Sequence, residues 1–300
     1  MKILTWNIQL QSTKGKDIKY IPDFVADELI YQNADIIVLT EFVRVSNWDI
    51  FLHEKLAGKG YKSFYLHDYT LKEIQKHADE YAKNEPKNKN KENVKGHINE
   101  ILVAIKKGSV KVKESENNLG SLFAEKGFNA NNLPNFLRVD LELADKKTLT
   151  IVGTRIRSGN PGHQREQLDG LLNHLDKIRN PVIAIGDFNA GSHYTKKSKW
   201  NWNDVFESDK GYLQGEKKYQ LKTPAHGFSN VNRGNLNSID HIISKGLEKE
   251  EIEISNLNYS WEFMSRDEEY RYDSKYPNFY PKVCFPDHAI LTANIEIIKK

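Results

Sequence analysis

The chain has 300 residues, 28% of them charged, and a net charge of +3, so its bulk charge gives no argument for nucleic-acid binding. A single cysteine, Cys284, excludes an internal disulfide framework. No apolar run approaches the roughly 20 residues that span a bilayer, and the opening MKILTWNI is too short and too polar for a signal peptide, so we expect a soluble, cytoplasmic protein.

Eight apolar runs predict strands along the chain. In order, they cover residues 3–8, 35–40, 100–105, 136–143, 149–156, 182–185, 239–244 and 289–297. Apolar residues recur every three or four positions in two segments, residues 21–33 and 163–178, and this spacing predicts helices. Strands and helices interleave first and later strands follow long irregular stretches, so the order predicts an α/β or α+β fold with two sheets. We expect one domain over residues 1–300, with a mobile Lys/Asn-rich loop at 83–96.

The segment PVIAIGDFNAG places polar residues directly after an apolar run. In extended geometry Asp187 and Asn189 would point to one side while Phe188 packs on the other, and Gly186 would leave room for close approach. A carboxylate and an amide would then face solvent together. The alternative is an ordinary strand-to-loop transition with an Asx turn.

Other strand ends carry the same kind of residue. Asn7 closes KILTWNI, Glu41 closes ADIIVLTE, Asp240 opens IDHIIS, and Asp287 with His288 precedes AILTANI. These side chains supply hard oxygen donors of the kind that bind Mg²⁺ or Mn²⁺, together with one titratable imidazole. We therefore expect them to converge on one metal site.

The ordered set TWNI, LTE, GDFNA, SIDHI and PDHA resembles the endonuclease/exonuclease/phosphatase superfamily, from Asn7 to His288. The resemblance implies a four-layered sandwich of two mixed β-sheets with helices outside. It also implies a metal-dependent phosphoesterase site at one edge of that sandwich.

The resemblance implies a role for each matched residue. Glu41 would be the principal metal ligand, with Asn7 as a ligand or phosphate contact and Asp287 binding metal or bracing the site. Asp187 would activate the attacking water and Asn189 would orient it. The roles of His288 and Asp240 would be linked, because His288 would contact a non-bridging phosphate oxygen while Asp240 holds and charges its imidazole.

The match departs from the family at one strand end. Where nucleases of this group carry Tyr or His, and phosphatase branches tend to read NTH, this chain has Arg155, with Arg157 two residues later. Both guanidinium groups could face the phosphate, since their planar fork suits it. Alternatively, both arginines are solvated edge residues.

Cations and aromatic residues follow GDFNA in the segment SHYTKKSKWNWND. Lys196, Lys197, Lys199 and Trp200 are candidates for substrate binding, because lysines track phosphates and aromatic rings stack on bases. Packing of these rings onto the sandwich is the other reading.

Three functions therefore stay open at this point. The first is a Mg²⁺-dependent nuclease acting on DNA or RNA, and the second is a phosphatase or phosphodiesterase of a small molecule or lipid head group. The third is a catalytically silent binding module. The shared motifs report chemistry and leave the substrate, the number of metals and the oligomeric state undetermined.

Overall fold

The computed structural model describes residues 1–9, 21–42, 46–65, 100–113, 135–143, 146–156, 161–189, 218–232, 235–263 and 286–298. The predicted loop at 83–96 lies outside these ranges. Within them, no helix is long and apolar enough to cross a bilayer.

Six strands form the first sheet in the order β13-β14-β1-β2-β4-β3. They are β1 (Lys2–Asn7), β2 (Ile36–Phe42), β3 (Tyr61–Tyr65), β4 (Glu100–Lys106), β13 (Ile252–Ser260) and β14 (Ile290–Ile297). β1 runs parallel to β2, and the other neighbours are antiparallel, so the sheet is mixed.

Six further strands form the second sheet in the order β5-β6-β7-β8-β12-β9. They are β5 (Lys111–Val112), β6 (Asn135–Glu142), β7 (Thr148–Arg155), β8 (Val182–Asp187), β9 (Gln220–Lys222) and β12 (Asp240–Lys245). This sheet is also mixed, because β7 and β8 are parallel while β8 and β12 are antiparallel. A short hairpin of β10 (Asn230–Asn232) and β11 (Asn235–Asn237) stands apart from both sheets.

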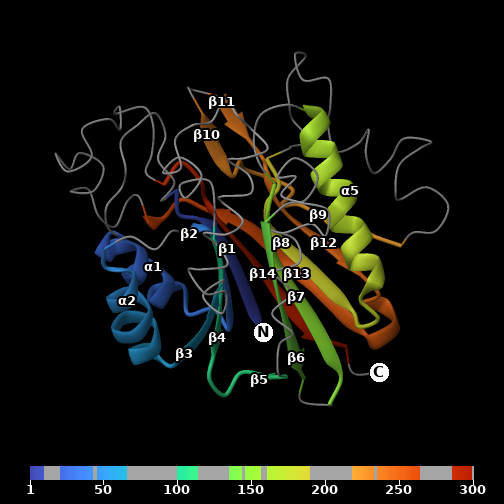
Figure 1. Ribbon diagram of the computed structural model, residues 1–300, viewed down its shortest axis with the longest axis horizontal. Coiled ribbons are helices and arrows are strands. Elements are labelled where there is room, and N and C mark those ends of the chain that lie inside the picture. Colours follow the sequence, from blue (N-terminus) through green and yellow to red (C-terminus); the bar gives the residue numbers. More distant parts are fainter. Residues whose placement is uncertain are drawn as a thin grey trace, which may run out of the picture.

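Helices cover the outer faces of the two sheets (Figure 1). On the first sheet lie α1 (Asp23–Gln32) and α2 (Trp48–Ile50), the latter continuing through a π-helical segment, Phe51–Leu56, into a 3₁₀ turn, Ala57–Lys59. On the second sheet lies α5 (Pro161–Lys177). A 3₁₀ turn at Glu248–Glu250 precedes β13.

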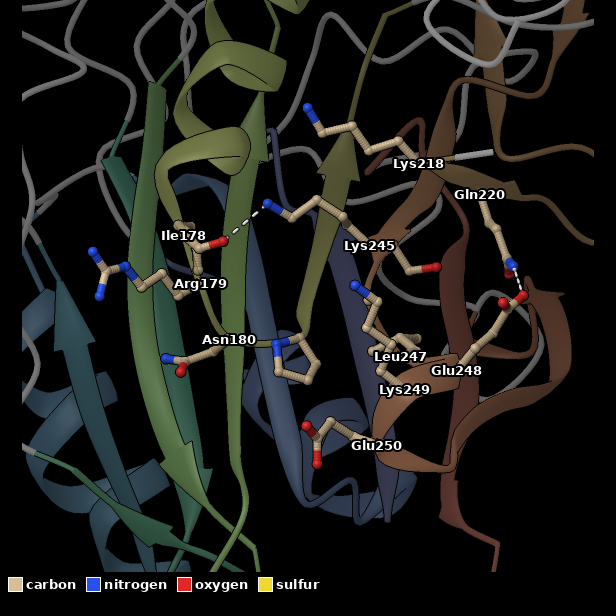
Figure 2. A pocket seen from close by; sticks show the side chains of 13 residues that line it. Ile178, Arg179, Asn180, Lys218, Gln220, Lys245, Leu247, Glu248, Lys249 and Glu250 are labelled. Atoms are coloured by element: carbon tan, nitrogen blue, oxygen red, sulfur yellow. Dashed lines mark hydrogen bonds between the residues drawn. The ribbon is translucent and has the colours of Figure 1, made fainter. Parts of the chain in front are cut away.

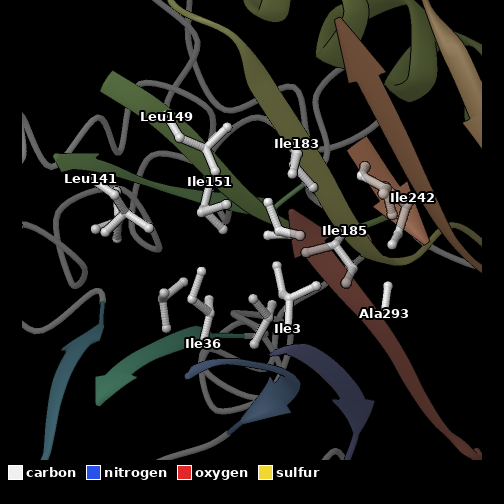
Figure 3. Close-up of a cluster of buried hydrophobic side chains, with 14 of the residues drawn as sticks. Ile3, Ile36, Leu141, Leu149, Ile151, Ile183, Ile185, Ile242 and Ala293 are labelled. Atoms are coloured by element: carbon white, nitrogen blue, oxygen red, sulfur yellow. The ribbon is translucent and has the colours of Figure 1, made fainter. Parts of the chain in front are cut away.

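The alternation of side chains along each central strand explains this layering. In β8, Ile183 and Ile185 face the core between the sheets (Figure 3). Val182 and Ala184 belong to the separate cluster beneath α5. A strand buried on both faces reads as a continuous apolar run, which is why these strands are visible in the sequence. The predicted sandwich of two mixed sheets between helices is confirmed.

A buried histidine on α5 gives the fold a specific pH dependence. His174 lies against Phe136 with ring centroids 4.2 Å apart, and its buried Nε2 has no hydrogen-bond partner among the residues that the structure describes. Burial, together with Arg138 and Lys177, lowers the pKa of His174 to about 4.

Because the unfolded histidine takes up a proton near its ordinary pKa of 6.5, the stability contributed by neutral His174 is complete above that pH and is lost as the pH falls towards 4. We expect His174→Gln to gain stability relative to the wild type over this interval, as measured by urea unfolding at several pH values. His53→Gln, at an exposed position, is the control. A constant difference between His174→Gln and the wild type would contradict the assignment.

Candidate active site

Strand register brings three of the predicted residues into one row at an edge of the second sheet. Arg155 at the end of β7 is the partner of Asp187 at the end of β8, and Asp187 is the partner of Asp240 at the start of β12. Their neighbouring backbones therefore place a guanidinium and two carboxylates side by side.

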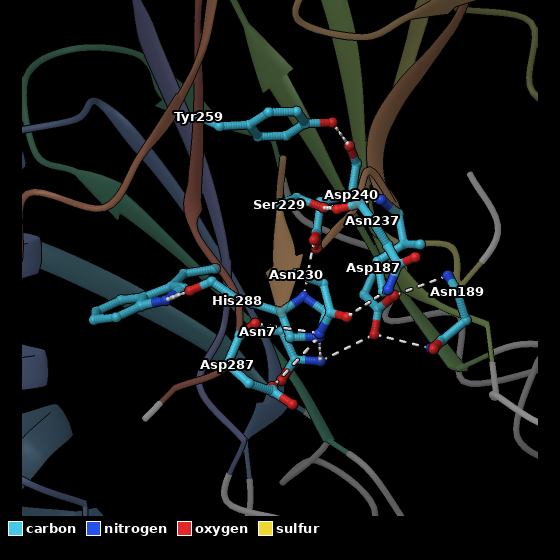
Figure 4. A network of polar contacts seen from close by, with 12 residues as sticks. Asn7, Asp187, Asn189, Ser229, Asn230, Asn237, Asp240, Tyr259, Asp287 and His288 are labelled. Carbon is cyan, nitrogen blue, oxygen red and sulfur yellow. Dashed lines mark hydrogen bonds and ion pairs between the residues drawn. The ribbon is translucent and has the colours of Figure 1, made fainter. Parts of the chain in front are cut away.

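The first sheet supplies the opposing side chains, and three contacts cross between the sheets. Asn7 at the end of β1 donates from Nδ2 to Asp187 Oδ2 at 2.9 Å. Arg155 Nη2 donates to Glu41 Oε1 at 2.5 Å. His288, just before β14, places Nδ1 2.8 Å from Asp240 Oδ2. Figure 4 shows Asn7, Asp187, Asp240, Asp287 and His288 close together at this edge.

Three residues at this edge have an uncommon backbone conformation. Gln9, Glu41 and Asn189 have positive φ values of 49°, 52° and 51°, which are uncommon for residues other than glycine. In β2 the pairing with β4 is irregular between Leu39 and Phe42, so Glu41 sits in a bulge. Such strain gathers at functional sites because the surrounding structure must hold it.

The GDFNA segment differs in one respect from the sequence expectation. β8 extends through Gly186 to Asp187 and then turns, because Asn189 adopts a left-handed conformation. The extended geometry predicted for residues 187–189 is therefore wrong, although Phe188 is fully buried as expected. The turn still brings both polar side chains together, with Asn189 Nδ2 donating to Asp187 Oδ2 at 2.9 Å.

Gly186 permits the close approach that the sequence predicts. Its φ is +152°, and a Cβ at this position would overlap the carbonyl oxygen of Thr154 on β7. A side chain here would push β8 away from β7 and displace the Arg155–Asp187 register.

Asp187 is buried, with 1% of its surface exposed, where a solvent-facing carboxylate was expected. It accepts hydrogen bonds from Asn7 Nδ2, from the Asn189 backbone N–H at 2.8 Å and from Asn189 Nδ2. Burial nevertheless raises the pKa of Asp187 to about 7, with Asp240 and Glu41 adding to the rise and His288 and Arg155 opposing it. A carboxyl with a pKa near neutrality suits a general base.

The surroundings of His288 favour its charged form, whereas those of Asp187 favour its neutral form. Burial alone would lower the pKa of His288, but Asp240, Asp187 and Asp287 outweigh burial and raise the pKa to about 10. The imidazole is therefore a cation at neutral pH, with Nδ1 donating to Asp240. The predicted pairing of Asp240 with His288 is confirmed geometrically.

Asp287 borders this pair from a more exposed position. Its Oδ1 lies 3.7 Å from His288 Nε2, and burial raises its pKa to about 6. Its backbone is fixed on both sides, since its N–H donates to Gln9 Oε1 at 3.0 Å and its carbonyl accepts from Asn230 Nδ2 at 3.2 Å.

Four residues that hold this arrangement were not predicted from the sequence: Gln9, Ser229, Asn230 and Tyr259. The Ser229 hydroxyl accepts the backbone N–H groups of Ile239 and Asp240, at 2.8 and 3.1 Å. Tyr259 donates from its hydroxyl to the Asp240 carbonyl at 2.6 Å. Of the four, Gln9 alone had a usable signal, because it follows Asn7 by two residues; the others lie in segments without a strong pattern.

Arg155 is buried, with 7% of its surface exposed, so its reading as a solvated edge residue is wrong. Besides its bond to Glu41, its Nε lies 3.7 Å from Asp187 Oδ2 and has no hydrogen-bond partner within the described chain. The guanidinium thus sits between two carboxylates, one from each sheet.

The donors of this edge fit a divalent cation. Carboxylate oxygens of Asp187 and Asp240 lie within 4.8 Å of each other, whereas the protonated imidazole of His288 beside them has no nitrogen free to coordinate a cation. Asp240 Oδ1 is buried without a hydrogen-bond partner in the described structure. Among the described residues, Arg155 and His288 are the cations that pair with the carboxylates of Glu41, Asp187, Asp240 and Asp287, so negative charge is in excess there when all four are ionised. Excess charge and an unsatisfied oxygen in a set of hard ligands are what Mg²⁺ or Mn²⁺ would compensate.

The predicted substrate-binding residues Arg157, Lys196, Lys197, Lys199 and Trp200 lie outside the described ranges. His241, which follows Asp240 in β12, is buried, and its Nδ1 lies 2.8 Å from the Thr223 hydroxyl.

A hollow of about 500 Å³ lies at the opposite end of β8 and β12, between Pro181 and Lys245 (Figure 2). There Lys245 donates to the carbonyl oxygens of Leu175 and Ile178, at 2.5 and 2.9 Å, and so caps the end of α5. The strand register separates this hollow from Asp187 and Asp240 by the length of both strands. It therefore takes no part in the candidate active site.

Comparison with known proteins identifies the family of the chain. A profile described as "Endonuclease/Exonuclease/phosphatase family" matches residues 4–251, and the chain belongs to that family. No curated protein sequence matches the chain significantly.

Solved structures of the same fold are similar at low sequence identity. A Bacteroides vulgatus endonuclease/exonuclease/phosphatase is 14% identical, with a TM-score of 0.62 over 99% of this chain and 98% of its own. D. rerio TDP2 in complex with single-strand DNA product is 13% identical, with a TM-score of 0.60 over 99% and 98%. ANGEL2, described as a 2',3'-cyclic phosphatase, is 12% identical, with a TM-score of 0.56 over 98% and 94%. At these identities the likeness establishes the fold alone.

Proposed function

We propose that the chain is a metal-dependent phosphoesterase and that its substrate is a phosphodiester of nucleic acid. The observation that carries the proposal is the juxtaposition of Asp187, whose pKa is raised to about 7, with the protonated pair His288–Asp240 across the two sheets. One group is suited to accept a proton and the other to stabilise negative charge, which phosphoester hydrolysis requires together.

In this proposal Asp187 takes the proton of the attacking water, whose oxygen bonds to phosphorus as the ester bond breaks, and the departing oxygen takes up a proton from solvent. Asn189 and Asn7 hold the Asp187 carboxylate in place through their amide groups. His288 contacts a non-bridging oxygen and stabilises the charge that develops there, and Asp240 keeps the imidazole protonated. Glu41, Asn7 and Asp287, together with the unpartnered Oδ1 of Asp240, would supply the oxygen donors for Mg²⁺ or Mn²⁺. The bound cation would polarise the phosphate and orient the water.

The preference for nucleic acid is supported by the lysines and tryptophan that follow GDFNA in the sequence. It is also supported by the fold shared with TDP2, whose structure contains a DNA product. The shared fold with ANGEL2, a 2',3'-cyclic phosphatase, favours a small phosphoester as the second candidate. The single domain over residues 1–300 and the cytoplasmic location stay predictions.

A substrate panel in Mg²⁺ separates these candidates. Single-stranded and duplex DNA, RNA, bis(4-nitrophenyl) phosphate and 4-nitrophenyl phosphate are incubated with the wild type and with Asp187→Asn as the blank. We expect cleavage of a polynucleotide by the wild type alone. Turnover of only the small esters would favour the second candidate, and no turnover of any phosphoester would favour a silent binding module.

A further inference from the structure

The ion pair between Arg155 and Glu41 has a consequence for metal binding. Arg155 Nη2 lies 2.5 Å from Glu41 Oε1, and the two side chains expose only 8% and 10% of their surface. A buried carboxylate with a cation at this distance is strongly compensated, because little water screens the pair.

The same carboxylate is the one that the family resemblance assigns to the metal. A divalent ion at Glu41 would share that side chain with the guanidinium, and two cations on one buried carboxylate repel each other. The two states are therefore alternatives for Glu41: a carboxylate held by Arg155 or a carboxylate held by metal.

A second carboxylate, that of Asp187, lies close to the Arg155 guanidinium. The Nε of Arg155 is buried without a hydrogen-bond partner in the described structure and faces Asp187 Oδ2 at 3.7 Å. The guanidinium can therefore leave Glu41 without leaving the site, because another buried carboxylate lies within reach.

We propose that Arg155 is a built-in competitor of the metal ion: it neutralises Glu41 in the metal-free protein and lowers the affinity of the site for divalent cations. This inference rests on the proposed function, since it assumes that the site binds metal. Removal of a metal ligand would weaken metal binding, whereas removal of Arg155 should strengthen it.

The test measures metal binding without activity. Mn²⁺ is titrated calorimetrically into metal-free wild type, Arg155→Met, Arg155→Gln and Arg155→Lys, and the Tm of each is recorded with and without Mn²⁺. We expect Arg155→Met and Arg155→Gln to bind Mn²⁺ about ten-fold more tightly than the wild type, because a like charge is gone. Arg155→Lys, which keeps the charge, should stay close to the wild type.

Thermal stability provides an independent readout. Metal-free Arg155→Met should melt lower than the wild type, because Glu41 is left uncompensated, and Mn²⁺ should raise its Tm by more. Arg138→Met is the matched control: it breaks another arginine–carboxylate pair of the same sheet, with Asp140, away from the site. It should lower the Tm and leave the Mn²⁺-induced increase unchanged.

Competition through Glu41 also predicts the result in a second background. In Glu41→Gln the further change Arg155→Met should tighten Mn²⁺ binding by clearly less than it does in the wild type, because only the direct repulsion between the two cations is relieved and no shared carboxylate is released. Equal or weaker Mn²⁺ binding by folded Arg155→Met and Arg155→Gln would overturn the inference. If the wild type and all variants bind no Mn²⁺, the proposed metal-dependent function fails and the inference falls with it.

Discussion

Replacing Asp187 with asparagine should lower turnover by about 10²- to 10⁴-fold while leaving the metal-free protein at least as stable as the wild type at neutral pH. The loss of turnover follows because an amide cannot accept the proton of the attacking water. Stability is retained because no buried charge has to be compensated and the asparagine oxygen can still accept from the side chains of Asn7 and Asn189, which offsets the loss of the bond from the Asn189 backbone N–H to the second oxygen.

The pH dependence of stability gives the sign of this effect. The pKa of Asp187 rises from 3.8 to about 7 in the folded protein. The favourable contribution of Asp187 to the free energy of unfolding is complete below its pKa in the unfolded chain and is lost as the pH rises towards 7. Asp187→Asn should therefore gain stability relative to the wild type over this interval, as measured by urea unfolding in EDTA.

The control for this prediction is Asp140→Asn, at a carboxylate that is bound by Arg138 of its own strand, β6, and by Thr150 of the neighbouring β7, outside the site. It should keep full turnover. A fall in the Tm of Asp187→Asn large enough to explain its lost activity would instead assign Asp187 a structural role.

Asp240 and His288 should behave as one unit. Each alanine substitution is expected to lower turnover by about 10²- to 10⁴-fold, and the double substitution should cost little more than either single one. The reason is the 2.8 Å contact between His288 Nδ1 and Asp240 Oδ2, through which Asp240 acts on the imidazole. The measurement is a double-mutant cycle: turnover of the wild type, the two single variants and the double variant is compared in one metal-saturated assay.

The pH profile tests the same pair independently. Because Asp240 contributes to the rise of the His288 pKa to about 10, Asp240→Asn should lower that pKa. Activity of Asp240→Asn should then fall with rising pH at a lower pH than in the wild type. Independent, multiplying losses with an unmoved alkaline limb would refute the pairing.

The central strands were predictable because burial on both faces leaves an uninterrupted apolar run. This holds for β2 and β8, whose residues are buried throughout. By contrast, β13 (Ile252–Ser260) was not predicted, because its register shifts between Ser255 and Asn258 and this bulge interrupts the alternation of apolar and polar residues. The edge strand β3 (Tyr61–Tyr65) is mostly half-buried and also lacks a clear pattern.

The site was predictable in its composition and less so in its geometry. Polar residues at the ends of apolar strands identified Asn7, Asp187, Asp240 and His288, because a strand end is where a buried backbone reaches the surface. The left-handed turn at Asn189 could not be read from alternation, which assumes an extended chain. The contacts of Ser229 and Tyr259 depend on how distant segments pack, so no local pattern reports them.

Arg155 illustrates the same limit for electrostatics. Its position at a strand end was visible in the sequence, and so was the possibility that it faces a phosphate. Its partner Glu41 is 114 residues away, on the other sheet. Only the packing of the two sheets brings these charges together and turns a departure from the family pattern into an expectation about metal affinity.

The most direct test of the central claim is chelation followed by restoration, measured on the substrate that the panel identifies. Hydrolysis by the wild type in EDTA should fall to the rate of Asp187→Asn, and Mg²⁺ or Mn²⁺ in excess of the chelator should restore it. Glu41→Ala should need a much higher metal concentration for the same recovery, because the site loses a hard ligand. Full hydrolysis by the wild type in EDTA would contradict a metal-dependent phosphoesterase at this edge of the sandwich.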